Sequence, residues 1–434
     1  MSPEAIGLIG IIAFLVLVLL RVQVAIALLA VGLVGYAWLV NSQVALAQLA
    51  MSSFGTAAKY SLSVMPMFIL MGMFLSNSGL ARELFKAADH WIGNIRGGLA
   101  MATLGASAIF ASISGSNNAT TATISKVALP EMKKYSYDPG LSAASVAAGG
   151  TLGVLIPPSV ILIVYGVLTM EPIGKLLIGG FIPGVLMCLV FMLTVYIQVR
   201  RNPRLAPVRK ERVPWTEKLR SLAPIWPFFL IFLVSIGGIY IGAFTPTEAG
   251  AIGSFGALLF ALATGRMNWR QFVASIEETV RLTGMIFFIL IGATLFGQFL
   301  AMSRIPAEVS SLVMGLDVNK YVIVVLILLV YVLLGCFMEG IAILVLTLPI
   351  VYPLMTDLGF DGIWLGIIMT LMFNIGTLTP PLGMGVFVIH GVNRDIPLPV
   401  IFRGVIPMIV AMFLFSLVLV AFPEIVTFLP GLMK

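Results

Sequence analysis

Charged side chains are scarce in this sequence, and their scarcity excludes an ordinary soluble protein. Asp, Glu, Lys and Arg make up 10% of the 434 residues, whereas 60% are hydrophobic. A soluble domain carries about a quarter charged residues. Apolar stretches of about 17–25 residues recur along the chain, each long enough to cross a bilayer as a helix. The alternating pattern of a membrane β-barrel is absent. The sequence therefore predicts an all-α polytopic protein embedded in the lipid bilayer.

The sequence has only two cysteines and two histidines, which argues against disulfide, metal and His- or Cys-dependent catalytic chemistry. Cys188 and Cys336 lie in separate apolar segments, and His90 and His390 are far apart. We therefore expect neither a disulfide framework nor a metal cofactor. No paired-His motif or nucleophile–base pair is present, which disfavours an intramembrane enzyme. No phosphate-binding loop is present either, so we expect no nucleotide cofactor and no ATP drive.

The net charge of +7 is concentrated in one short loop, "RRNPRLAPVRKERVPWTEKLR" at 200–220. Eight basic residues minus two glutamates leave +6 there. The basic residues are Arg200, Arg201, Arg204, Arg209, Lys210, Arg212, Lys218 and Arg220. Positive residues in short loops face the cytoplasm, so this charge indicates membrane topology and not a nucleic-acid partner. No basic leader precedes the first apolar run, so we expect no cleavable signal peptide.

The two halves of the chain repeat similar short segments at a nearly constant offset of 223–225 residues. The pairs are "LSNSGLARE" (75–83) with "LAMSRIPAE" (300–308), "YDPGL" (137–141) with "FDGIW" (360–364), "IPPS" (156–159) with "TPPL" (379–382), and "FIPG" (181–184) with "VIPM" (405–408). This pattern indicates a duplicated unit that covers 60–199 and 285–422.

The charge of the loops predicts that the two units have opposite orientations. Loop 131–138 contains Lys133 and Lys134 and is expected in the cytoplasm, whereas its counterpart, 355–361, has no Lys or Arg and is expected outside. An odd number of spans between the units agrees with this, and we place them at 224–243, 247–264 and 277–300. Inverted repeats are typical of secondary transporters, which bind substrate at the repeat interface.

Each unit contains a predicted re-entrant hairpin. The loops on both sides of 97–130 are basic, so the two apolar segments of this region cannot be two full crossings. We expect a hairpin whose tip, "SGSNNAT" (114–120), lies partway through the membrane. The second hairpin has its tip at "FMEG" (337–340) and enters from the outside.

A break inside an apolar span follows each hairpin, at "AAGGTLGVLIPPS" (147–159) and "FNIGTLTPP" (373–381). Glycine pairs and Pro-Pro interrupt helical hydrogen bonding, and such backbone is tolerated at depth only inside protein or beside a cavity. Unwound carbonyls and Ser, Thr and Asn oxygens are hard neutral ligands, while helix N-termini favour a carboxylate. The breaks therefore favour a Na⁺ site. The alternative is that the hydroxyls and glycines serve helix packing.

Glu339 in the second tip is expected to be functional. An unpaired carboxylate at the bilayer centre costs about 2.5–3.5 kcal/mol on insertion scales. The alternative is a glutamate in a water-filled cleft or paired with an arginine. Arg304 is either a partner for an acidic substrate or an ordinary interfacial arginine.

Taken together, these segments resemble the large membrane subunit of the tripartite ATP-independent periplasmic (TRAP) transporters. The resemblance covers nearly the whole chain. It is carried by "SGSNNATTATISKVALPEMKKYSYDPGLSAASVAAGGTLGVLIPPS" (114–159), "FTPTEAGAIG" (244–253), "NIGTLTPPLG" (374–383) and "DIPLPVIFRGVIP" (395–407).

The resemblance implies an elevator-type transporter in the bacterial cell inner membrane. It implies coupling to Na⁺ and import of organic acids, with sialic acid, C4-dicarboxylates, other sugar acids and keto acids all open. Two protein partners are implied, a periplasmic substrate-binding protein and a small transmembrane subunit. We expect the small subunit to be a separate chain, because this chain is too short to include it.

The same resemblance implies two Na⁺ sites, each between a hairpin tip and the break of the same unit. The implied ligands are Ser114, Ser116, Asn117, Asn118, Gly150, Thr151 and Val154 for the first ion, and Gly340, Asn374, Gly376, Thr377 and Thr379 for the second. The implied substrate residues are Ser116, Glu339, Arg304, Pro157 and Pro380.

The expected fold is therefore all-α, with inverted structural repeats, two re-entrant helical hairpins and two broken transmembrane helices. Its parts are scaffold helices at 1–59, a first repeat at 60–199 (hairpin 80–135, broken helix 140–170, helix 174–199), a basic loop at 200–222, linking helices at 223–284, a second repeat at 285–422 (hairpin 320–356, broken helix 362–392, helix 398–422) and a tail at 423–434. A self-sufficient ion-coupled carboxylate carrier of similar fold, working without a binding protein, is the alternative. A passive channel does not explain the hairpins.

The inverted orientation is testable by labelling. Single cysteines replacing Lys133 and Asp361 should react with a membrane-impermeant thiol reagent from opposite sides of the membrane, because one loop is basic and the other is not. Labelling of both from the same side would contradict the inverted repeat.

Overall fold

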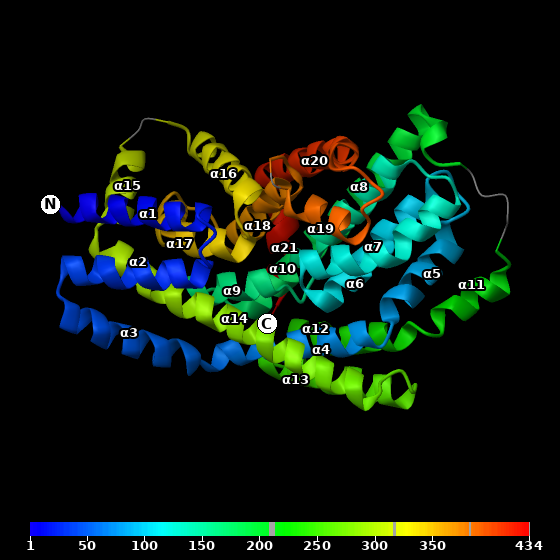
Figure 1. Cartoon of the computed structure of the whole chain (residues 1–434), viewed down its shortest axis with the longest axis horizontal. Coiled ribbons are helices and arrows are strands. Elements are labelled where there is room, and N and C mark those ends of the chain that lie inside the picture. The colour runs from blue at the N-terminus through cyan, green and yellow to red at the C-terminus, as the bar shows by residue number, and fades with distance from the viewer. Residues whose placement is uncertain (208–212, 316–317, 382, 434) are drawn as a thin grey trace.

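The computed structural model describes residues 1–207, 213–315, 318–381 and 383–433, and over these residues the chain is helical without β-strands (Figure 1). Residues 208–212 of the basic loop, which include Arg209, Lys210 and Arg212, lie outside the described residues, as does Leu382 of the repeated "TPPL" segment. The expectation of an all-α fold is confirmed.

The helices differ widely in length, from three residues in η2 and η3 to 34 in α14. In chain order they are α1 (Pro3–Leu19), α2 (Val24–Leu39), α3 (Ser42–Ala57), η1 (Tyr60–Ser63), α4 (Val64–Asn77), α5 (Leu80–Ile92), α6 (Gly98–Ser114), α7 (Asn117–Lys134), α8 (Pro139–Thr151), η2 (Leu152–Val154), α9 (Val160–Thr169), α10 (Ile173–Arg201), η3 (Pro203–Leu205), α11 (Trp215–Leu222), α12 (Trp226–Tyr240), α13 (Pro246–Ala263), α14 (Trp269–Met302), α15 (Ile305–Met314), α16 (Lys320–Phe337), α17 (Gly340–Asp357), α18 (Gly362–Leu378), α19 (Met384–Val392), α20 (Leu398–Ala421) and α21 (Glu424–Leu432).

Seven of the described helical segments are long and apolar enough to cross a membrane, or eight if α11 and α12, which meet at a 46° bend, form one span. The seven are Tyr60–Asn77, Ile173–Arg201, Pro246–Ala263, Trp269–Met302, Lys320–Phe337, Gly340–Asp357 and Leu398–Ala421. The prediction of a multi-pass helical membrane protein is thus confirmed.

The start of α14 differs from the sequence prediction. The third linking span was expected to begin at 277, but the helix begins at Trp269 and is 34 residues long. Asn268 and Gln271 cap it reciprocally: the Asn268 Oδ1 accepts from the Gln271 amide at 2.9 Å, and the Gln271 Oε1 accepts from the Asn268 amide at 2.9 Å. This capping box satisfies two amides at the helix start, so the polar segment after it stays helical.

Two helix pairs and two helix interruptions occupy the ranges in which the hairpins and breaks were expected, and their placement in a membrane stays a prediction. Two antiparallel pairs, α6–α7 and α16–α17, turn at 115–116 and 338–339, and α5 precedes the first pair as a separate helix. The broken helices are α8–η2–α9 and α18–α19, and both interruptions contain a cis Pro–Pro bond, Pro157–Pro158 and Pro380–Pro381. In Figure 1, α6–α7 extends from the centre to one end of the molecule and α16–α17 toward the other.

Equivalent aspartates begin the two broken helices. The Asp138 carboxylate accepts from the Leu141 amide at 2.9 Å, and the Asp361 carboxylate accepts from the Trp364 amide at 2.8 Å. An aspartate in this position satisfies one of the free amides of a first helical turn and is stabilised by the helix dipole. The repeated "YDPGL" and "FDGIW" segments therefore encode the same local structure.

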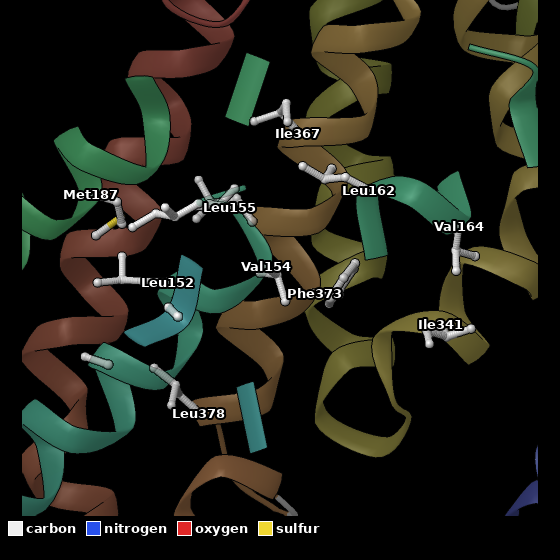
Figure 2. Packing of buried hydrophobic residues seen from close by; sticks show 14 of the residues in the cluster. Leu152, Val154, Leu155, Leu162, Val164, Met187, Ile341, Ile367, Phe373 and Leu378 are labelled. Carbon is white, nitrogen blue, oxygen red and sulfur yellow. The ribbon is translucent and has the colours of Figure 1, made fainter. Parts of the chain in front are cut away.

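Helices of the two halves pack against one another in a matched way. α8 packs on α20 and α18 on α10, while the second helix of each hairpin contacts the far part of the other half's broken helix, α7 with α19 and α17 with α9. Figure 2 shows the apolar core that results, in which Val154 and Leu155 of the first break share one cluster with Phe373 and Leu378 of α18.

Polar contacts also join each hairpin region to the other half of the chain. The Lys133 Nζ lies 2.9 Å from the Asp395 carboxylate, so α7 is joined to the segment after α19. The hydrogen bond from Lys133 lowers the pKa of Asp395 below its usual value. The Tyr352 hydroxyl of α17 donates to Glu171 at 2.7 Å, and the Tyr165 hydroxyl of α9 donates to the Gly362 carbonyl at 2.6 Å. Each hairpin is thus held to the other half of the chain.

A second group of helices forms the opposite wall of the molecule. α14 packs along α2, α3 and α4, and α13 packs on α4 and α12. α4 and α14 also contact the hairpins, through α6 and α17 respectively. These two helices therefore bring the two groups of elements together.

Close backbone approach at Gly376 gives a stability prediction. A Cβ atom at Gly376 of α18 would overlap the backbone of Gly335 and the Val332 carbonyl of α16, and backbone cannot move aside as a side-chain end can. Gly376→Ala should lower the free energy of unfolding by about 1–3 kcal/mol, as overpacking does. The readout is the Tm of the purified protein. Gly284→Ala in α14, where no atom lies within 4 Å of the added Cβ, is the matched control and should leave the Tm unchanged or raise it.

Candidate functional site

A cavity of about 370 Å³ lies where both hairpin tips and both broken helices meet α4 and α14. The residues that line it include Ile69, Gly72, Met73 and Ser76 of α4; Ser114, Gly115, Ser116, Asn117, Asn118, Ala119 and Thr121 of the first hairpin; Ala147, Thr151, Val154, Val160 and Ile161 of the first broken helix; Glu278, Leu282, Met285 and Ile286 of α14; Glu339, Gly340 and Ile341 of the second hairpin; and Phe373, Thr377, Leu378, Met384 and Gly385 of the second broken helix.

Gly115 shapes the first tip. Its φ of +59° lies in the left-handed region, which glycine adopts without a Cβ penalty, and a Cβ there would lie 2.8 Å from the Pro158 carbonyl oxygen of the first break. Ser116 then begins α7, and its hydroxyl accepts from the Ala119 amide at 3.4 Å. The amide end of α7 consequently lies at the cavity, where it supplies partial positive charge.

An amide pair joins the first tip to the second broken helix. The Asn117 Nδ2 donates to the Asn374 Oδ1, and the Asn374 Nδ2 donates to the Thr370 carbonyl at 2.8 Å. The Asn117 Oδ1 is buried and has no hydrogen-bond partner among the described residues. Leaving a buried acceptor unsatisfied costs about 1–3 kcal/mol of stability. A ligand that donates a hydrogen bond to this oxygen, or a cation that it coordinates, would remove that cost.

The first break closes against the first tip. At Gly150 a Cβ would overlap the Thr121 hydroxyl and lie 3.2 Å from the Asn117 carbonyl oxygen, so these elements are in close contact. The Thr151 hydroxyl donates to the Ala148 carbonyl at 2.7 Å, and its lone pairs remain available. Thr151 and Val154 line the cavity beside Ser116. All residues of the expected first set except Gly150 therefore line one cavity. Gly150 packs against Thr121 and the Asn117 carbonyl instead.

The second break and tip meet in a similar way, but only part of the expected second set reaches the cavity. Gly340 and Thr377 line it, and the Thr377 hydroxyl donates to the Asn374 carbonyl at 2.7 Å. Gly376 instead packs against α16. The Thr379 hydroxyl donates to the Ile375 carbonyl at 2.7 Å, and this threonine is not among the lining residues.

Arg304 is not brought to the cavity, contrary to its expected place beside an acidic substrate. It begins α15, after the end of α14. The part of α14 that lines the cavity ends at Ile286, and the helix continues for sixteen residues, about 24 Å at 1.5 Å each, to Met302 before Arg304 follows. Pro157 and Pro380 lie inside the two breaks but do not line the cavity either. Glu339 does line it.

Sequence reasoning missed the wall formed by α4 and α14. Glu278, Leu282, Met285 and Ile286 follow one another at helical spacing and all line the cavity. The sequence offered one indication, the charged Glu278 at the start of an apolar segment. The span was expected to begin at 277, so Glu278 was assigned to its end and not to a cavity wall. No cluster of three or more His, Cys, Asp or Glu side chains suited to a metal occurs in the described parts of the chain.

Residues 11–425 match the family described as the DctM component of tripartite ATP-independent periplasmic transporters. The chain is 36% identical over 384 residues to the C4-dicarboxylate TRAP transporter large permease protein DctM of Pseudomonas aeruginosa, covering 88% of this chain and 89% of that protein. It is 31% identical over 379 residues to the sialic acid TRAP transporter large permease protein SiaM of Vibrio cholerae, covering 87% and 88%.

A solved structure shares the fold. The YdaH transporter of Alcanivorax borkumensis superposes with a TM-score of 0.61, over 96% of this chain and 98% of that one, at 14% sequence identity. At this identity the likeness concerns the fold alone.

Proposed function

Because this chain belongs to the DctM family of TRAP transporter large permeases, we propose that it imports organic acids by coupling them to Na⁺. Its relatives are transporter permeases and not enzymes, and the cargoes in their names are C4-dicarboxylates and sialic acid. We place the protein in the bacterial inner membrane. The observation that carries the proposal is the cavity between two hairpin tips and two broken helices, lined largely by uncharged oxygens and apolar side chains.

The first Na⁺ binds between the first tip and the first break. Hydroxyl, amide and carbonyl oxygens from Ser114, Ser116, Asn117, Asn118, Gly150, Thr151 and Val154 are the proposed ligand pool. The unpartnered Asn117 Oδ1 supports this position, because a hard monovalent cation suits a neutral oxygen. The second Na⁺ binds at the second break, with oxygens drawn from Gly340, Asn374, Gly376, Thr377 and Thr379.

Transport proceeds by an elevator motion, in which the hairpins and broken helices move as one body against the wall that contains α4 and α14. The contacts that tie each hairpin to the other half's broken helix support a common body. The cavity lies between the two groups, so cargo bound there is carried with the moving body. Each Na⁺ that crosses 100 mV contributes about 2.3 kcal/mol, and two ions contribute about twice that.

The proposed partners are a small transmembrane subunit and a periplasmic binding protein that delivers the cargo. Family membership supports both. The exposed apolar side chains on the membrane-spanning helices contact the lipid bilayer and the small subunit.

Reconstitution tests the function. Liposomes that contain this chain and its small subunit should take up a labelled organic acid only with an inward Na⁺ gradient and with the binding protein present. Equal uptake by the chain alone would instead favour the self-sufficient carrier. Uptake that does not respond to Na⁺ would contradict the proposed coupling.

Substitutions at the first site test the Na⁺ ligands. Thr151→Ala and Asn117→Ala should each raise the Na⁺ concentration for half-maximal uptake about tenfold, which corresponds to about 1.4 kcal/mol for one lost coordinating oxygen. The measurement is uptake rate against Na⁺ concentration. Thr103→Ala is the matched control, because the buried Thr103 hydroxyl also donates to a backbone carbonyl, that of Leu99, but does not line the cavity. An unchanged Na⁺ dependence in both site variants would remove these residues from the ligand set.

A further inference from the structure

Two carboxylates line the cavity, and none of its described lining residues is an arginine, lysine or histidine. Glu278 and Glu339 come from opposite walls, α14 and the second hairpin tip. We propose that the cargo is a zwitterionic organic acid, whose cationic nitrogen binds between these two glutamates. This inference rests on the proposed function and narrows its cargo class.

Glu339 is presented to the cavity by the second tip. The tip backbone is enclosed, since Met338 is 5% exposed and Gly340 is buried, whereas the Glu339 side chain itself is accessible. Glu339 occupies the N-cap position of α17 but makes no side-chain capping bond. It forms no ion pair with any residue of the described ranges. Its carboxylate is therefore available to a ligand.

Glu278 lies on the cavity-facing stripe of α14. Leu282, Met285 and Ile286 follow it at helical spacing and line the cavity with it. Arg281, one turn along the helix, does not line the cavity, and the structure shows no ion pair between the described Arg281 and Glu278. Glu278 thus contributes an uncompensated negative charge on the wall opposite Glu339.

The charge of the cavity discriminates between cargo classes. A dicarboxylate would place a second negative end beside Glu278 or Glu339, and like charges in a partly desolvated site repel strongly. A cationic nitrogen in the same place gains a charge-assisted hydrogen bond from each carboxylate. The proposed Na⁺ ions attract the carboxylate that both cargoes carry, whereas Glu278 and Glu339 act on the end at which the two cargoes differ.

The other end of a zwitterion also has a place to bind. The amide end of α7 lies at the cavity with the Ser116 hydroxyl and the Asn118 side chain. Helix N-termini bind carboxylates through free amides and the helix dipole. The cavity therefore has one end suited to a carboxylate and another suited to an ammonium or amidinium group.

Binding to the full-length chain in lipid nanodiscs at a fixed, saturating Na⁺ concentration tests the inference. The probes are ω-amino acids of three to six carbons and the dicarboxylates of the same lengths, compared by calorimetry. The best ω-amino acid should bind at least tenfold more tightly than any dicarboxylate. Glu278→Gln and Glu339→Gln should each reduce that ratio about tenfold, and Glu278→Lys should reverse it.

Glu277→Gln provides the matched control, because Glu277 is exposed on the same helix but does not line the cavity, and its ratio should stay at the wild-type value. Tighter binding of a dicarboxylate, a ratio unmoved by Glu278→Gln and Glu339→Gln, or no binding of any ω-amino acid at millimolar concentration would each overturn the inference. Na⁺-dependent binding of a dicarboxylate would overturn it while leaving the proposed function in place.

Discussion

Backbone that leaves the helix inside a membrane must still find hydrogen-bond partners, and the structure depends on how this chain meets that constraint. Both breaks, at 152–159 and 379–381, lie within apolar sequence where lipid offers no partners. The first break packs against the first hairpin and α10, and the helix that leads into the second break packs against the second hairpin. The same packing creates the cavity. Where the hairpin tips and the breaks meet, no regular helix runs through, and a space remains between them.

The enclosure depends on small residues and on contacts between the halves. Gly376 lets α18 approach the backbone of α16, and Gly115 lets the first tip turn against the first break. Asn117 and Asn374 form a polar link across the same region. Close packing of backbones at the tips and breaks places hydroxyl and amide groups of Ser116, Asn117 and Thr151 at the cavity, beside apolar side chains.

The two walls of the cavity have different chemistry. The hairpin wall carries hydroxyls, amides and one carboxylate, whereas α4 and α14 add apolar side chains, Ser76 and Glu278. In the proposed elevator motion only the first wall travels, so a cargo bound by both walls would have to release Glu278 before it moves. The remote likeness to the YdaH transporter, at 14% identity, indicates that the arrangement of helices persists when most side chains change.

The sequence by itself determined the features that arise from local chemistry. Apolar length predicted the spans, glycine and proline located both breaks, loop charge predicted the hairpins, and Asp138 and Asp361 encode matching helix starts. Tertiary structure alone decided which distant residues meet. It joined Asn117 to Asn374, brought Glu278 into the cavity and left Arg304 beyond the far end of α14. Caps, breaks and apolar length depend on interactions within a few residues, so a short stretch of sequence reveals them. Contacts between distant residues depend on how whole helices pack against one another. No short stretch of sequence specifies that packing.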